Sequence, residues 1–156
     1  MDNLITYRLF VLGDKIFAAN IRRVLTVMKL NKITKTSNTP SYLRGFFLYQ
    51  GIVLPLIDLR LKFGFTVIEK TDFFNILVVS INIGNEIIQI GVLVDIILDE
   101  TILLQQNITL VTSIVQTAYS KFLSGIYTGS NGTDILIIDV DKVFSLNAFF
   151  DVDELN

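Results

Sequence analysis

Few residues in this sequence combine the side-chain chemistry and the spacing of a catalytic or metal site. The chain contains no histidine and no cysteine, which removes the commonest general base and the ligands of most zinc sites. Asp139 and Asp141 could together bind a hard cation, but acids this close in sequence more often cap a helix or stay solvated. The segment 129–132, GSNG, lacks the Lys-Ser/Thr of a phosphate-binding loop and is typical of a hairpin loop. We expect no catalytic residue, no metal and no cofactor.

The segment 51–64, GIVLPLIDLRLKFG, ends an apolar run in a charged pair. Pro55 cannot donate to a β-ladder, so the run is predicted to be an edge strand or to carry a bulge. Asp58 is a good N-cap for the turn that follows, which also contains Arg60. Gly64 lies where a left-handed C-cap is expected. The pattern favours a structural role for Asp58 over a catalytic one.

The candidate residues described above are predicted to lie on or between short strands, because turn signals divide the chain into β-rich runs. Runs 4–12 and 15–19 flank Gly13-Asp14, and runs 74–82 and 86–95 flank Gly84-Asn85, which predicts two hairpins. A further run follows at 133–140. Helical signals are short: a turn capped by Asn20, a helix or irregular connection over 113–123, and a closing helix over 139–150. The predicted class is therefore mainly β with short helices.

The composition indicates how many apolar side chains must be buried, and the net charge excludes some partners. The 156 residues are 51% hydrophobic, with a mean hydropathy of +0.58, and suit one domain or two small subdomains. So many apolar side chains indicate either exposed patches that contact other proteins or a thick core buried on two sides. The sequence leaves both open. The 13 basic and 15 acidic residues give a net charge of −2, so we expect no nucleic-acid partner.

A membrane-spanning segment is not expected. The longest uncharged run, 101–120, is interrupted by Gln105, Gln106 and Asn107, whereas a spanning helix needs about 20 mostly apolar residues. The first ten residues lack the basic region of a signal peptide. We expect a cytoplasmic protein without direct membrane insertion.

The order of the motifs resembles the CheW family of bacterial chemotaxis coupling proteins along nearly the whole chain. The matching positions include an opening Phe-x-Leu-Gly pattern, an Ile-x-x-Val turn and a central Pro-x-x-Asp-Leu-Arg segment. The motif positions are Phe10, Leu12, Gly13, Phe17, Ala18, 21–24, 33–34, 38–40, Gly45, Gly51, Val53, 55–60, 91–95, 122–125 and 136–144. Those to which we assign a structural role are Gly13, Pro40, Gly51, Pro55, Asp58, Arg60, Gly64, Asp95 and Gly125.

The resemblance implies an all-β fold of two SH3-like five-stranded barrels packed together, with short helices. A single domain over 1–156 would divide approximately into subdomains 1–68 and 69–156, with the terminal segments free to cross between them. Asp58 and Arg60 would then hold a corner of the first barrel. The family function would be that of a non-enzymatic adaptor. It would join the cytoplasmic helical hairpin of chemoreceptors to the regulatory domain of the histidine kinase CheA, in arrays at the inner membrane.

The resemblance also assigns contact residues. The receptor would contact Val24, Thr26, Gln50, Ile76 and Glu100, and the kinase would contact Ile108, Thr109 and Ile114.

The chain departs from the family pattern at several of these positions. The family has a Glu at the position of Thr26, an Arg at that of Gln50 and an Asn at that of Leu48. The family's Ile-x-Pro-x-Pro loop has become 108–112, without proline. Because the opposite charges are lost together, we expect Thr26 and Gln50 to face each other across neighbouring strands.

Two other functions stay open on the sequence alone. The first is a divergent CheW-like paralogue that serves a distinct receptor subset or a non-flagellar kinase pathway. The second, of another class, is a small-ligand-binding β-barrel or an enzyme, although no polar set converges in the sequence.

Overall fold

The structure, a computed structural model, describes residues 3–36, 40–68, 72–111 and 117–145. Strands make up most of this part, and every helix is three or four residues long. The elements in chain order are β1 (Leu4–Leu12), β2 (Lys15–Asn20), η1 (Ile21–Arg23), β3 (Val24–Leu30), β4 (Thr34–Lys35), β5 (Leu43–Tyr49), β6 (Ile52–Asp58), α1 (Leu59–Lys62), β7 (Phe74–Ile83), β8 (Glu86–Val94), β9 (Ile96–Leu104), η2 (Gln105–Asn107), β10 (Ile108–Leu110), η3 (Ser120–Phe122), β11 (Leu123–Thr128), β12 (Asp134–Ile138) and α2 (Val140–Val143).

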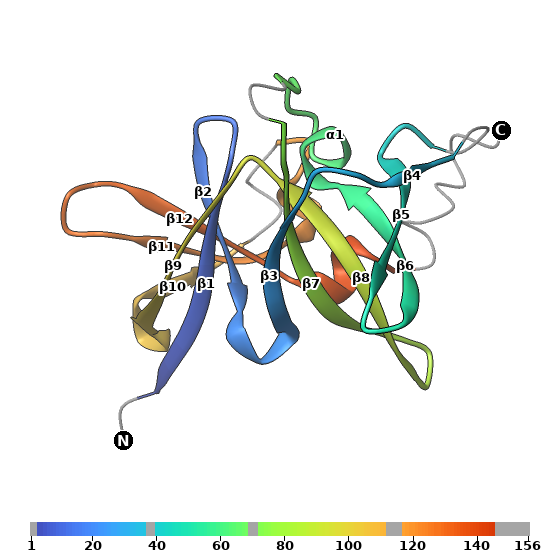
Figure 1. Cartoon of the computed structure of the whole chain (residues 1–156). Helices are drawn as coiled ribbons and strands as arrows, with labels where there is room; N and C mark the ends of the chain where they lie inside the picture. Colours follow the sequence, from blue (N-terminus) through green and yellow to red (C-terminus); the bar gives the residue numbers. More distant parts are fainter. Residues whose placement is uncertain (1–2, 37–39, 69–71, 112–116, 146–156) are drawn as a thin grey trace, which may run out of the picture.

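The strands form two curved sheets that stand side by side (Figure 1). The first sheet has the order β10-β11-β12-β2-β1-β9, and the second has the order β3-β7-β8-β6-β5-β4. This arrangement confirms the predicted all-β class with two barrel-like subdomains. Each sheet has six strands rather than five, because a short strand joins five longer ones: β10 in the first sheet and β4 in the second.

The two sheets do not follow the expected division between residues 68 and 69. β1 and β2 belong to the same sheet as β9–β12, and β2 pairs in parallel with β12 through Ile16 and Ile135. The second sheet is formed entirely by the chain between them, residues 24–94. A cut at residue 68 would separate paired strands in both sheets.

The predicted hairpins are confirmed, and the position of β6 is a partial correction. β1 pairs with β2 around Gly13-Asp14, and β7 pairs with β8 around Gly84-Asn85. β6 is not an edge strand, because it lies between β5 and β8. Its pairing with β8 covers only Leu56–Asp58, so Pro55, which has no N–H, lies just before that ladder begins.

The helices are shorter than the sequence pattern allowed. η1 is a single turn, and its cap Asn20 accepts a hydrogen bond from the Arg22 amide at 3.0 Å. Of the segment 113–123, the described part contains the turn η3, and 112–116 lie outside the described residues. The closing helix is α2, which ends at Val143, and 146–156 lie outside the described residues.

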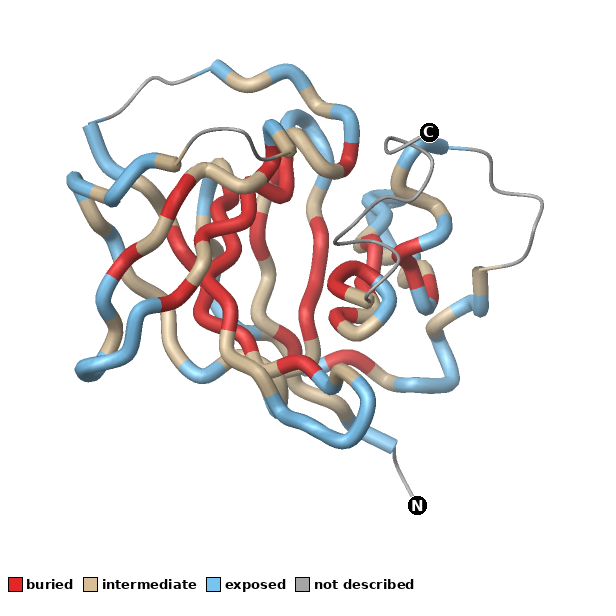
Figure 2. Tube along the Cα trace, turned by 90° about the vertical axis from the view of Figure 1, so that its right-hand side faces the viewer, coloured by how far each residue is buried: buried red, intermediate tan, exposed pale blue. Residues whose placement is uncertain are grey.

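The hydrophobic core has three parts. The largest cluster lies between the sheets, where Phe10 and Phe17 of the first meet Leu77 and Val92 of the second. The other two clusters fill the inside of each barrel. Figure 2 shows buried segments through the middle of the molecule and exposed ones at the hairpin turns. Central strands are thus buried on both faces, and yet eleven large hydrophobic residues among those described remain exposed.

Candidate interaction surfaces

A buried charged network occupies the corner where β6 meets α1. The Asp58 side chain is fully buried, and it accepts a hydrogen bond from the Arg60 amide at 3.0 Å, as the N-cap prediction requires. The same carboxylate accepts from Arg60 Nε and Nη2, both at 2.9 Å, and from Arg44 Nη1 at 2.8 Å. Two guanidinium groups therefore share one carboxylate, and charge-assisted bonds of this kind are the stronger class of hydrogen bond.

The network continues from the second sheet to the first. Arg60 Nη1 lies 3.2 Å from Asp95 Oδ1, and Asp95 Oδ2 accepts from the Gly13 amide in the β1–β2 turn at 2.7 Å. Burial by itself would lower the pKa of Arg60, but the hydrogen bonds and charges of Asp58 and then Asp95 outweigh it, so the pKa is raised. Arg60 therefore stays charged and ties the two barrels together.

Gly64 closes the same corner. It follows α1 with a φ of +86°, and its amide donates to the Leu61 carbonyl at 3.2 Å, while the Phe65 amide donates to the Arg60 carbonyl at 2.8 Å. These two bonds form a Schellman motif, which needs a left-handed residue at this position. The structural roles expected for Asp58, Arg60 and Gly64 agree with this geometry.

The acidic pair Asp139 and Asp141 has two structural tasks. Asp139 caps α2 by accepting from the amides of Asp141 and Lys142. Asp141 forms an ion pair with Arg23 and accepts from the Asn82 amide at 2.8 Å. The hydrogen bond from Arg23 is the main reason that the pKa of Asp141 is lowered. Within the described ranges, no three His, Cys, Asp or Glu side chains lie close enough to hold a metal ion.

The residues expected to contact a receptor are spread over both sheets. Thr26 on β3 lies opposite Val78 of β7, close to Ile76 on the same strand. Ile76 is fully buried inside the second barrel, so it supports β3 from behind and presents no surface. Glu100 lies on β9 of the first sheet, where it pairs with Arg8 at 3.0 Å. The fold brings only Thr26, Val24 and Ile76 together.

The expectation that Thr26 and Gln50 face each other across neighbouring strands is wrong. Gln50 lies in the β5–β6 turn, and β7 and β8 separate β3 from β6 in the sheet. The start of β3 and the β5–β6 turn lie only at the same end of the second sheet, the lower end in Figure 1. Gln50 has a φ of +49° and is followed by Gly51 at +79°, as a tight hairpin turn requires.

Two of the three residues expected to contact the kinase, Ile108 and Thr109, lie on β10. Thr109 is exposed, whereas Ile108 is half-buried and packs inside the first barrel. Gly125 on β11 leaves the space that the Ile108 side chain fills. Ile114 lies outside the described residues.

Sequence reasoning missed an apolar surface at the two hairpin turns of the second barrel. Leu48 and Val53 are paired across β5 and β6, and each is 65% exposed. Ile52 beside them is 54% exposed, and Ile87 near the β7–β8 turn is 76% exposed. We call these four residues the hairpin-end surface. The Leu in place of the family's Asn at position 48 was the signal, but strands apolar on both faces do not reveal which face is exposed.

The comparison with protein families decides the identity of the fold. A family model described as the CheW-like domain matches residues 6–148. The chain belongs to the CheW family. Proteins of this family are adaptors of chemotaxis signalling.

Individual CheW proteins agree with this assignment. A chemotaxis protein CheW of Klebsiella aerogenes is 27% identical over 140 residues, which cover 89% of this chain and 81% of that protein. The chemotaxis protein CheW of Helicobacter pylori is 44% identical over 55 residues, 35% of this chain and 33% of that protein. The scaffolding protein CheW of Thermoanaerobacter tengcongensis shares the fold. Its crystal structure superimposes with a TM-score of 0.79 at 24% identity and covers 95% of this chain and 96% of that one.

The CheW-like motif at residues 55–60 therefore marks the fold more than a contact surface. Its Asp and Arg lie in the network at the barrel junction, where they are shielded from solvent.

None of the helices in the described part of the chain has the length and hydropathy that a membrane crossing requires.

Proposed function

We propose that this CheW-family chain is a non-enzymatic adaptor that joins the cytoplasmic helical hairpin of chemoreceptors to the regulatory domain of CheA. In this role it is recruited to receptor arrays at the inner membrane and supports their assembly. The observation that carries the proposal is the hairpin-end surface, where four large apolar side chains stand exposed at the β5–β6 and β7–β8 turns. Exposed apolar patches of this kind mark protein contacts, because leaving them in water is unfavourable.

The receptor contact uses the lower end of β3 and the hairpin-end surface. Val24, Thr26 and Gln50 supply its side chains, Ile76 holds β3 in place, and Glu100 with its partner Arg8 contributes from β9. A helical hairpin presents apolar side chains along its length, and these match exposed Leu48 and Val53. The kinase contact in a ring of subunits uses Ile108 and Thr109 on β10, together with Ile114.

Co-sedimentation tests the two contacts separately. The chain is mixed with vesicles that carry a chemoreceptor cytoplasmic fragment, with the CheA regulatory domain, or with both, and the bound fraction is measured. We expect binding of both partners, and we expect Leu48→Ser with Val53→Ser to lower receptor binding. The control is Leu4→Ser, which removes a leucine of comparable exposure (57%) from the first barrel. Failure to sediment with either partner would overturn the proposal.

A second candidate is a divergent adaptor for a distinct receptor subset or another kinase pathway. The specific observation in its favour is that Thr26 and Gln50 carry no charge, while Glu100 on β9 is already paired with Arg8 of β1. Binding of the kinase without binding of ordinary chemoreceptor fragments would support this candidate.

A further inference from the structure

We propose that a pocket between the two barrels receives a lysine or arginine side chain from a helix of a protein partner. The pocket lies at the end of the barrels where the β1–β2 turn meets the start of β7 and the β8–β9 junction, opposite the hairpin-end surface (Figure 1). It contains none of the residues expected to contact receptor or kinase. The inference is therefore independent of the proposed function.

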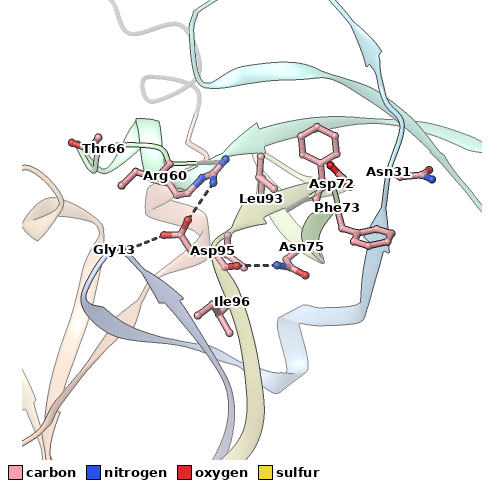
Figure 3. A pocket seen from close by; sticks show the side chains of 13 residues that line it. Gly13, Asn31, Arg60, Thr66, Asp72, Phe73, Asn75, Leu93, Asp95 and Ile96 are labelled. Carbon is pink, nitrogen blue, oxygen red and sulfur yellow. Dashed lines mark hydrogen bonds and ion pairs between the residues drawn. The ribbon is translucent and has the colours of Figure 1, made fainter. Parts of the chain in front are cut away.

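The pocket has room for a long side chain. Its volume is about 640 Å³, within the range of ligand-binding pockets. In Figure 3 the Asp95 carboxylate, Gly13 and Arg60 lie on one side, and Phe73, Asp72 and Asn31 lie on the other. Its lining consists of Gly13, Asn31, Arg60, Thr66, Ile68, Asp72, Phe73, Phe74, Asn75, Leu93, Val94, Asp95 and Ile96.

The walls suit an aliphatic stem with a cationic head. Leu93 and Val94 are buried apolar residues of the wall, and two phenylalanines stand beside them. Lysine and arginine bury their methylene stems against such surface while the charged head finds a polar partner. The ring of Phe74 already lies 5.9 Å from the Arg44 guanidinium, so a cation is accepted at this wall from within the protein.

The polar groups of the lining offer acceptors. The Asn75 amide nitrogen donates to the Asp95 carbonyl at 2.8 Å, which leaves Asn75 Oδ1 without a hydrogen bond among the described residues. Each Asp95 carboxylate oxygen accepts one bond, from Arg60 or Gly13, and can accept a second. Asp72 is exposed and has no ion pair among the described residues.

The same geometry disfavours an anion. Arg60 is the one cation in the described lining, and its guanidinium is already shared between Asp58 and Asp95. The network of Arg44, Asp58, Arg60 and Asp95 is neutral as a whole, so Asp72 leaves the pocket with a net negative charge. A cationic head fits this balance.

The rim indicates that the cation comes on a protein. Ile68, Phe73 and Ile96 are 61%, 54% and 52% exposed around the pocket. A small amine inside the pocket would leave these side chains in water, whereas a helix that inserts one basic residue covers them with the apolar residues one turn before and after it.

The test uses a designed peptide as the probe. It is an alanine-based helix of about 16 residues with one arginine and a leucine one turn to each side. A matched peptide carries citrulline, which has the shape of arginine without its charge. Each is titrated into the isotopically labelled full chain, and amide chemical shifts are followed. We expect the arginine peptide to shift Gly13, Asn75 and Ile96 with a dissociation constant of about 0.1–1 mM, and the citrulline peptide to bind about fivefold more weakly.

Two variants assign the effect to the pocket. Asp72→Asn and Phe73→Ala should each weaken the arginine peptide by about threefold to fivefold, whereas Glu86→Gln, an exposed acid in the β7–β8 turn, should change nothing. Both pocket side chains are exposed, so neither change endangers folding. Equal binding of both peptides, binding unaffected by Asp72→Asn, or no shifts at millimolar peptide would overturn the proposal. Arginine methyl ester that binds as tightly as the peptide would also overturn it and make the pocket a small-molecule site.

Discussion

At the scale of single residues, Asp58 has a larger task than capping a turn. Its carboxylate holds Arg60 and Arg44, whose side chains are only 6% and 23% exposed. Asp58→Ala leaves both guanidinium groups without this counter-ion, and breaking a buried pair costs about 3–5 kcal/mol. We expect urea unfolding to show a loss of that size, with partner affinity unchanged in the molecules that remain folded.

Asp139→Ala is the matched control for Asp58, because Asp139 caps α2 with its side chain and forms no ion pair among the described residues. Loss of a cap alone costs about 1 kcal/mol. Equal losses in the two variants would show that the charged network contributes nothing beyond the cap.

The lowered pKa of Asp141 makes the free energy of unfolding depend on pH in the acid range. The hydrogen bond from Arg23 is the main cause of this lowering. An aspartate in the unfolded chain has a pKa of about 3.9. The contribution of the pair is therefore complete above about pH 4 and is lost as the pH falls through the lowered folded-state pKa. We expect the difference in urea midpoint between wild type and Asp141→Asn to shrink below about pH 4. Asp99→Asn, at an exposed position on β9, should show no such trend.

At the scale of elements, Gly91 shows how β8 fits against its neighbours. It lies buried on β8, and a Cβ there would enter the ring of Phe47 on β5. Gly91→Ala overpacks the second barrel and should cost about 1–3 kcal/mol. Phe47→Leu in the same chain makes room, so we expect the double variant to lose less than the sum of the two single losses, measured by urea unfolding. Strict additivity would show that the ring moves aside freely.

Local chemistry explains which elements could be predicted from the sequence. The turns at Gly13-Asp14 and Gly84-Asn85, and the caps Asn20 and Asp58, depend on residues next to one another, and all are found as expected. Ile76 was assigned by the resemblance alone, and no local pattern could show its burial, because β7 is apolar on both faces and its alternation does not distinguish barrel interior from surface. The prediction that Thr26 and Gln50 lie on neighbouring strands was also wrong, because the order of strands in the sheet places β7 and β8 between them.

At the scale of the whole molecule, the balance of apolar and charged surface predicts a weak response to salt. Only 18% of residues are charged, and the residues assigned to the kinase contact, Ile108, Thr109 and Ile114, carry no charge. Contacts of this kind depend on burial more than on electrostatic attraction. We expect the affinity for the CheA regulatory domain to change by less than about threefold between about 50 mM and about 500 mM salt. A steep decline, measured by titration calorimetry, would contradict this view of the surface.

The resemblance to the CheW family supplied the two-barrel architecture, and composition left open how the apolar residues are used. Both readings of the composition hold together: Phe17 lies in the shared core, while Leu48 lies exposed. The pairing of Ile16 with Ile135 joins distant parts of the chain, and no local pattern indicates it. The pocket escaped prediction for the same reason, because its walls come from five stretches that are separate in the sequence.

The first sheet combines strands from both ends of the chain, so its strands become available for pairing at different times during translation. Every strand of the second sheet has left the tunnel soon after Val94 is made, but β2 must wait for β12, which ends at Ile138. This takes several seconds at bacterial elongation rates. During that time the edge of β2 that later pairs with β12 has no partner strand. Phe10 and Phe17 share a core cluster with the second sheet in the folded chain, so we expect them to pack on that sheet before β12 arrives. The second barrel would then be the template on which the first is completed.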